Sequence, residues 1–212
     1  MKKHIVCLGD SNTHGYCADP ADSKDHTNRF NEDERWTCLL QKHLGEEYLI
    51  LEEGLGGRTS VFTDPLHESM DALSVAYPIL MSHEPVDLLL IMLGTNDTKE
   101  RFHVNAAAIA AGMDRLIKKC LSTECWGEGG PKILLICPPP MGDGFHDEIM
   151  GEGCIEKSRS LPPYMEAVAK ANGISFFDAK DCPFNTLDFM HLSREGHRIL
   201  AEKLSDIIPG LL

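Results

Sequence analysis

The sequence predicts an α/β fold, a three-layer αβα sandwich in which helices cover both faces of a parallel sheet of about five strands. Short apolar runs alternate along the chain with longer segments of helical periodicity, which is typical of βαβ units. The chain has 212 residues, of which 42% are hydrophobic, so it is long enough to bury a full core. Its length falls within the usual range of one domain, and we expect residues 1–212 to form a single domain.

Five short apolar runs are the expected strands. They span residues 4–8, 48–51, 87–92, 132–137 and 174–177. Between them, apolar residues recur at helical spacing in four segments: 36–44, which Gly45 ends; 109–121; a stretch around 164–171; and the segment from Ser193, a suitable N-cap, to Pro209. Strands and helices therefore alternate as βαβ units require.

Two long irregular stretches interrupt this pattern, at residues 18–34 and 138–153. Loops of this length in compact domains usually carry functional residues. We expect both to flank the active site.

Charge and hydropathy exclude two classes of partner. The formal net charge is −13, and no basic cluster is longer than the pairs Lys2-Lys3 and Lys118-Lys119, so binding to a phosphate backbone is not expected. No run approaches the roughly 18 apolar residues of a membrane span, and the apolar part of MKKHIVCLG is too short for a signal peptide. A cytoplasmic location is the expectation.

The eight cysteines agree with that location. Without a secretory signal they are expected to stay thiols, although their even number would allow four disulfides. They form no CxxC pair, so no metal site is predicted, and nothing in the sequence calls for a cofactor.

The loops that follow the strands hold the candidate chemistry, because ligands of open parallel sheets bind outside the carboxyl ends of the strands. Ser11 follows the first strand within Gly9-Asp10-Ser11-Asn12-Thr13, where the glycine permits a sharp turn that exposes the hydroxyl. Taken alone, such a triplet is more often an ordinary turn with a helix N-cap.

Asp188 and His191 form the second candidate, on a turn just before the last helix. At a separation of three residues the carboxylate can reach one imidazole nitrogen while the other nitrogen faces a nucleophile. His191 could instead merely pack within its loop. Asp178 and Asp181 are rival acids, but neither has a histidine at short spacing.

Two further loops could bind the oxyanion that forms during acyl transfer. The glycines of Gly54-Leu55-Gly56-Gly57 would let backbone N–H groups approach a substrate, and the amide of Asn96 is a neutral donor. A flexible turn for the glycines and an Asx-turn or cap for Asn96 are the ordinary alternatives.

The order of these blocks, GDSNTHG, EEGLGGRTS, IMLGTND and DFMHLSREGH, resembles the SGNH or GDSL hydrolase superfamily. The likeness covers nearly the whole chain. The segments ERW, DLLLIMLGTNDTKERF, the triple proline at 138–140 and FFDA are similar to the arylesterase and acyltransferase branch. The resemblance implies the flavodoxin-like sandwich of that superfamily.

Carried over by position, the resemblance makes Ser11 the nucleophile, with Asp188 and His191 as the other triad members. The oxyanion donors are then Ser11, Gly57 and Asn96. Gly57 aligns with the family's donor better than Gly56 does, Asp10 is a supporting residue that anchors the serine turn, and Asn12 replaces the leucine of GDSL. We expect Asn12 to affect the acyl pocket and not the mechanism.

The implied function is hydrolysis of a small acyl ester through an acyl-enzyme, with possible transfer of the acyl group to an alcohol or peroxide. The branch also implies a homo-oligomer whose narrow apolar channel is formed partly by neighbouring subunits. Close alternatives are an acyl-thioesterase and a carbohydrate acetylesterase. A flavodoxin-like binding module would need a phosphate loop that is absent here, and an α/β-hydrolase would need a G-x-S-x-G elbow, where this chain has Thr13.

Overall fold

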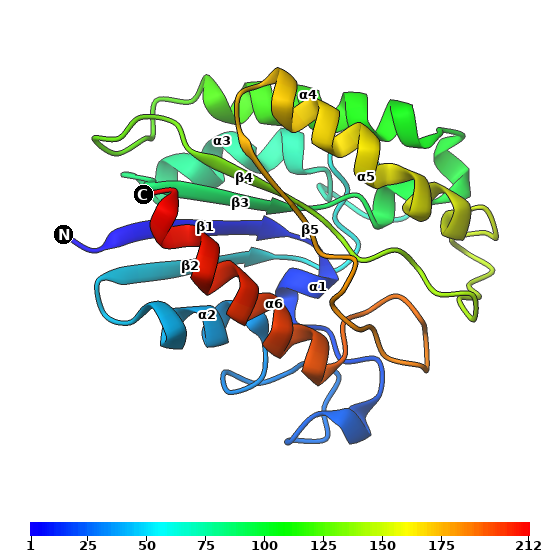
Figure 1. Cartoon of the computed structure of the whole chain (residues 1–212). Coiled ribbons are helices and arrows are strands. Elements are labelled where there is room, and N and C mark those ends of the chain that lie inside the picture. The colour runs from blue at the N-terminus through cyan, green and yellow to red at the C-terminus, as the bar shows by residue number, and fades with distance from the viewer.

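The computed structural model describes all residues 1–212 and contains one parallel sheet of five strands (Figure 1). The strands are β1 (Lys3–Gly9), β2 (Tyr48–Gly54), β3 (Leu88–Met92), β4 (Ile133–Cys137) and β5 (Ser175–Asp178). They lie in the order β2-β1-β3-β4-β5, so β1 is flanked on both sides. The predicted fold class and all five predicted strands are confirmed.

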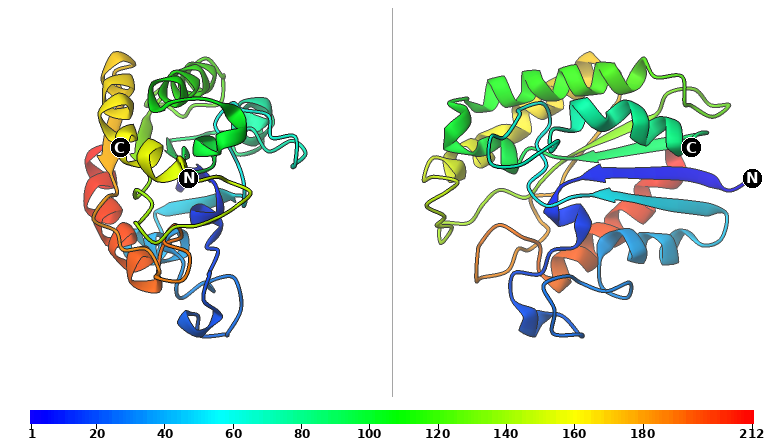
Figure 2. Two further views of the ribbon diagram at one scale, coloured as in Figure 1. Left: turned by 90° about the vertical axis from the view of Figure 1, so that its right-hand side faces the viewer. Right: turned by 180° about the vertical axis from the view of Figure 1, so that it is seen from behind.

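Helices cover both faces of the sheet. One face carries α3 (Ala72–Ser82), α4 (Ala106–Leu121) and α5 (Cys154–Ala171), and the other carries α2 (Trp36–Leu44) and α6 (Arg194–Ile207) (Figures 1 and 2). A short helix, α1 (Ser11–His14), follows β1 directly. The structure is therefore the three-layer sandwich that the sequence predicts.

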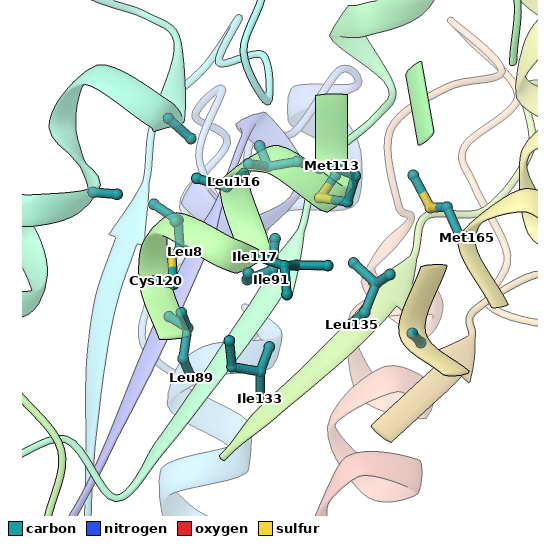
Figure 3. Close-up of a cluster of buried hydrophobic side chains, with 14 of the residues drawn as sticks. Leu8, Leu89, Ile91, Met113, Leu116, Ile117, Cys120, Ile133, Leu135 and Met165 are labelled. Atoms are coloured by element: carbon teal, nitrogen blue, oxygen red, sulfur yellow. The ribbon is translucent and has the colours of Figure 1, made fainter. Parts of the chain in front are cut away.

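Side chains of the central strands alternate between two cores. Leu8, Leu89 and Ile91 pack against α4 and its neighbours, as Figure 3 shows, whereas Cys7 and Leu90 pack on the side of α2 and α6. Every side chain from Leu88 to Met92 is buried. Burial on both faces explains why this strand reads as a continuous apolar run.

The helices differ from expectation in two places. Helix α3 was not expected, because its apolar residues lie on most sides and Pro78 stands within it. The Asp71 carboxylate caps it by accepting the N–H of Ser74 at 2.9 Å. Helix α5 begins at Cys154, ten residues before the segment predicted from periodicity, and it accommodates Pro162 and Pro163.

The register of the sheet places the ends of β1, β2 and β3 side by side. Gly9, the last residue of β1, pairs with Gly54 at the end of β2 and with Met92 at the end of β3. The segments after these strands therefore start side by side at the carboxyl edge, which faces the viewer in the left panel of Figure 2.

The two long irregular stretches lie at this end of the molecule (Figure 1). Four of their five large apolar side chains, those of Phe30, Met141, Phe145 and Met150, are buried within the chain, whereas Ile149 is 70% exposed. Most of these residues thus cover their own core. None of the helices is both long and apolar enough to span a membrane.

Candidate active site

Ser11 stands just after the carboxyl end of the interior strand β1, as the first residue of α1. The Asp10 carboxylate caps this helix by accepting the N–H of Asn12 at 2.9 Å. A Cβ at Gly9 would lie 2.0 Å from Oγ1 of Thr13, so only glycine fits where the strand turns into the helix. This tight turn presents the Ser11 side chain at the sheet edge, with the residue 8% exposed.

His191 and Asp188 reach Ser11 from the loop that precedes α6. Nε2 of His191 lies 2.8 Å from Oγ of Ser11, and its Nδ1 lies 2.6 Å from Oδ2 of Asp188. Burial alone would raise the pKa of Asp188, but its hydrogen bonds and charge interaction with His191 outweigh burial and lower it. The carboxylate therefore stays ionised beside the imidazole, and the arrangement can accept a proton from the serine hydroxyl.

The loop that carries this pair is tied together by its own side chains. Oδ1 of Asp188 accepts the N–H groups of Met190 and His191 at 3.0 and 3.1 Å and the amide of Asn185 at 3.0 Å. Asn185 also donates to the carbonyl of His191 at 2.9 Å. One oxygen of Asp188 thus folds the loop while the other orients the imidazole.

The rival acids lie elsewhere. Asp178 accepts the backbone N–H of Lys180 at 3.0 Å, and Asp181 lies 3.6 Å from Nζ of Lys203. Neither contacts His191, so Asp188 is the acid that the structure brings to the imidazole.

Asn96 and two buried carboxyl groups join the loops after β1, β2 and β3. The Asn96 amide donates to Oδ2 of Asp10 over 3.4 Å, and Asp97 accepts the backbone N–H of Ser60 at 2.9 Å. Burial raises the pKa of both Asp10 and Asp97 to about 6, and the charge of Asp10 adds to the rise at Asp97. These contacts fix the Asn96 amide beside Ser11.

A cavity of about 300 Å³ opens on these groups. Its lining consists of Ser11, Tyr16, Gly56, Gly57, His67, Asn96, Lys99, Arg101, Asp147, Ile149, Met150, Met190 and His191. Gly57 has a φ of +87°, a left-handed conformation that favours glycine. The backbone N–H groups of Gly56 and Gly57 have no acceptor within the chain.

The cavity surface is largely apolar, and charged side chains form part of its lining. Lys99 and Arg101 both line it, and both also contact the buried Asp64, at 2.8 and 2.9 Å. Asp147 and His67 add polar groups to the lining. The segment after Asn96 thus turns two cations toward the site.

Asn12 differs from its expected role as well. The side chain is 1% exposed and does not line the cavity. Its Oδ1 instead accepts the backbone N–H of Leu192 at 2.8 Å. The polar residue at this position therefore faces the loop that carries His191, residues 185–192 (the histidine loop), and the expectation that it affects the acyl pocket is wrong.

Sequence reasoning missed several residues around the site. The ring of Tyr16 packs on His191 with centroids 4.5 Å apart, Asn185 folds the histidine loop, and Asp64 holds the two cations. None of these stands in a strand-end motif, and only contacts between loops assign them a role. No group of His, Cys, Asp and Glu is placed to hold a metal ion.

A serine hydroxyl, an imidazole and an ionised carboxylate in one hydrogen-bonded series, beside an open cavity, are the machinery of a serine hydrolase. Comparison with known proteins gives the family. The model of the GDSL-like lipase/acylhydrolase family matches residues 7–199, and the chain belongs to this family. It is a serine esterase of the SGNH type, a carboxylic ester hydrolase, as the four sequence blocks predict.

Solved structures agree with this assignment. The aryl esterase of M. smegmatis is 34% identical, with a TM-score of 0.89 over 99% of this chain and 100% of that chain. A carbohydrate acetylesterase from Sinorhizobium meliloti is also 34% identical, with a TM-score of 0.87 over the full length of both chains. No curated protein matches the chain.

Proposed function

We propose that this esterase hydrolyses short-chain acyl esters through an acyl-enzyme on Ser11. The observation that carries the proposal is the hydrogen-bonded series Ser11, His191, Asp188, of which Ser11 and His191 line the cavity. His191 takes the hydroxyl proton as Oγ attacks the ester carbonyl, and Asp188 stabilises the imidazolium. The tetrahedral intermediate then collapses, the C–O bond to the alcohol breaks, and His191 returns the proton to the leaving alcohol. Water then attacks the carbonyl of the acyl-enzyme and gives its proton to His191. The ester bond to Ser11 breaks, the acid is released, and His191 returns the proton to Oγ.

Three donors are proposed for the oxyanion. Ser11 opens a helix, where the first N–H groups have no intrahelical acceptor. Gly57 contributes its unpaired N–H, and Asn96 contributes the amide that Asp10 orients. Gly56 shares the lining and the free N–H, so the choice of Gly57 rests on its alignment with the family block.

The size and lining of the cavity support a small acyl group and a polar alcohol. About 300 Å³ accommodates an acetyl ester more readily than a long acyl chain. Lys99, Arg101 and Asp147 offer donors and acceptors to a hydroxylated leaving group. Aryl acetates and acetylated sugars are therefore the two substrate classes that we propose, in line with the similar aryl esterase and carbohydrate acetylesterase.

The acyl-enzyme also permits transfer. An alcohol or a peroxide that attacks in place of water would receive the acyl group, and the ester or peracid formed would measure the ratio of transfer to hydrolysis. We include this activity in the proposal.

A homo-oligomer and a cytoplasmic location complete the proposal. Ile149 lines the cavity and is 70% exposed, so a second copy that covers it would bury apolar surface and narrow the entrance. Sedimentation at micromolar concentration tests this assembly, and a monomer with full activity would refute it. The eight cysteines are thiols, seven of them buried, which suits a reducing compartment.

The decisive test combines one variant with one panel of substrates. Ser11→Ala should lose nearly all hydrolysis of aryl acetates while remaining folded, and an organophosphate should add one adduct to Ser11 of the native enzyme. The panel compares aryl acetates, acetylated sugars and acyl-thioesters, and preference for thioesters would refute the substrate classes proposed. A folded Ser11→Ala enzyme with most of its activity would refute the mechanism.

A further inference from the structure

Asn12 connects two segments that lie far apart in the sequence. It belongs to the serine turn, residues 10–14, and its Oδ1 accepts the N–H of Leu192 in the histidine loop, residues 185–192, at 2.8 Å. Its backbone is held as well, since its N–H donates to Asp10 and its carbonyl accepts the indole N–H of Trp36 at 3.1 Å. The backbone of Asn12 is therefore fixed, and its side chain can hold the histidine loop in position.

Two hydrogen bonds join the serine turn to the histidine loop. One is the contact between Oγ of Ser11 and Nε2 of His191, and the other is the bond from Leu192 to Asn12. The first cannot persist through the reaction, because an acylated Oγ has no proton to donate. The second involves no reacting atom and remains when the first is lost.

We propose that Asn12 is a positioning residue that keeps Nε2 of His191 in place throughout the acyl-enzyme cycle. The inference rests on the proposed roles of Ser11 and His191. During deacylation the imidazole must activate water beside the acylated serine, with no hydroxyl proton to hold it. A leucine, the residue that gives this family its name, offers no acceptor to the Leu192 N–H.

The histidine loop does not depend on Asn12 for its fold. Asn185 and Asp188 tie it internally, and Asp188 lies in the same loop as His191. Loss of the bond to Asn12 should therefore shift the loop as a unit relative to Ser11, and the pairing of His191 with Asp188 should survive. Small displacements of a catalytic group from its productive position cost on the order of 10- to 100-fold in rate.

The experiment compares three variants in steady-state kinetics and in inactivation by a small organophosphate. Asn12→Leu removes the acceptor, and Asn12→Asp restores an acceptor oxygen of the same shape. The control, Asn172→Leu, makes the same chemical change at the far end of α5, where the amide donates to Asp114 and to the carbonyl of Val168. If Asn12→Leu does not fold, Asn12→Ala removes the same acceptor without added volume and takes its place.

The expected result is a 10- to 100-fold lower kcat and a matching loss of Ser11 reactivity in Asn12→Leu, with KM within about twofold of the native enzyme. Asn12→Asp should recover most of kcat, and Asn172→Leu should lose stability without losing kcat. Native kcat in folded Asn12→Leu, or an equal loss in Asn172→Leu, would overturn the inference. If Ser11→Ala and His191→Ala lost activity while Asn12→Leu kept native kcat, the proposed function would be supported and the positioning role of Asn12 would be refuted.

Discussion

Nε2 of His191 lies 2.8 Å from Oγ of Ser11, although 180 residues separate the two along the chain. The contact exists because Ser11 follows the interior strand β1 and the histidine loop reaches it on the way from β5 to α6. The imidazole that we propose as the base is therefore in place before substrate binds, so proton transfer needs no prior rearrangement of the protein.

Asp188→Asn should abolish most activity without unfolding the protein. The amide oxygen can still accept the loop N–H groups, but its NH₂ group would face Nδ1 of His191 and favour the tautomer in which Nε2 carries the proton. We expect kcat to fall by roughly 10³- to 10⁴-fold. Asp178→Asn and Asp181→Asn serve as matched controls and should keep native kcat. A large loss in either control would reassign the acid.

Asn96→Ala should reduce kcat more than it raises KM, because the amide is proposed to bind the oxyanion and not the ground-state ester. Removal of one such donor costs about 10²- to 10³-fold. Asn105→Ala removes another asparagine, the N-cap of α4, and should affect stability alone. An effect of Asn96→Ala confined to KM would argue against the oxyanion role.

Asp10→Asn should stabilise the protein increasingly as pH rises. Burial raises the pKa of Asp10 from 3.8 to about 6, so its contribution to stability is fully present below 3.8 and is lost as pH rises through about 6. An asparagine cannot ionise, and its oxygen can still accept the N–H of Asn12. Between pH 4 and pH 7.5 the variant should gain roughly 2 kcal/mol relative to the native protein.

Urea unfolding of both proteins at the two pH values measures this gain. If the stability difference between the two proteins did not change with pH, this would contradict a raised pKa of the buried Asp10 carboxyl group. Activity of Asp10→Asn should fall in either case, because Asn96 loses its charged partner.

Lys99→Met should weaken the fold by breaking a buried ion pair. Asp64 is 2% exposed and pairs with both Lys99 and Arg101. Burial alone would raise the pKa of Asp64, but these partners lower it to about 2. The stability that the ionised Asp64 contributes is therefore present above pH 3.8 and is lost as pH falls toward 2. Loss of one partner should cost about 3 kcal/mol and raise the pH of acid unfolding.

The matched control for that variant is Lys118→Met. Its ion pair with Asp114 is exposed on α4, and pairs of this kind contribute little. Equal destabilisation by the two variants would show that burial of the Asp64 pair is unimportant.

The sheet could be predicted from the sequence because a strand buried on both faces is a continuous apolar run, as in Leu88–Met92. Helix α3 could not, because an apolar sequence with Pro78 inside has no helical periodicity. The candidate site was predicted as four strand-end blocks. The contacts between the blocks, such as Asp97 with Ser60 or Asn12 with Leu192, depend on the register of loops that periodicity does not describe.

The position of His191 so late in the chain has a consequence for biosynthesis. All five strands have been translated once Asp178 is added, yet His191, the proposed base, follows thirteen residues later. A nascent or truncated chain that ends between these points can assemble a sheet with Ser11 at its edge and still lack a base. Hydrolytic activity is therefore expected only from chains whose translation has passed the histidine loop.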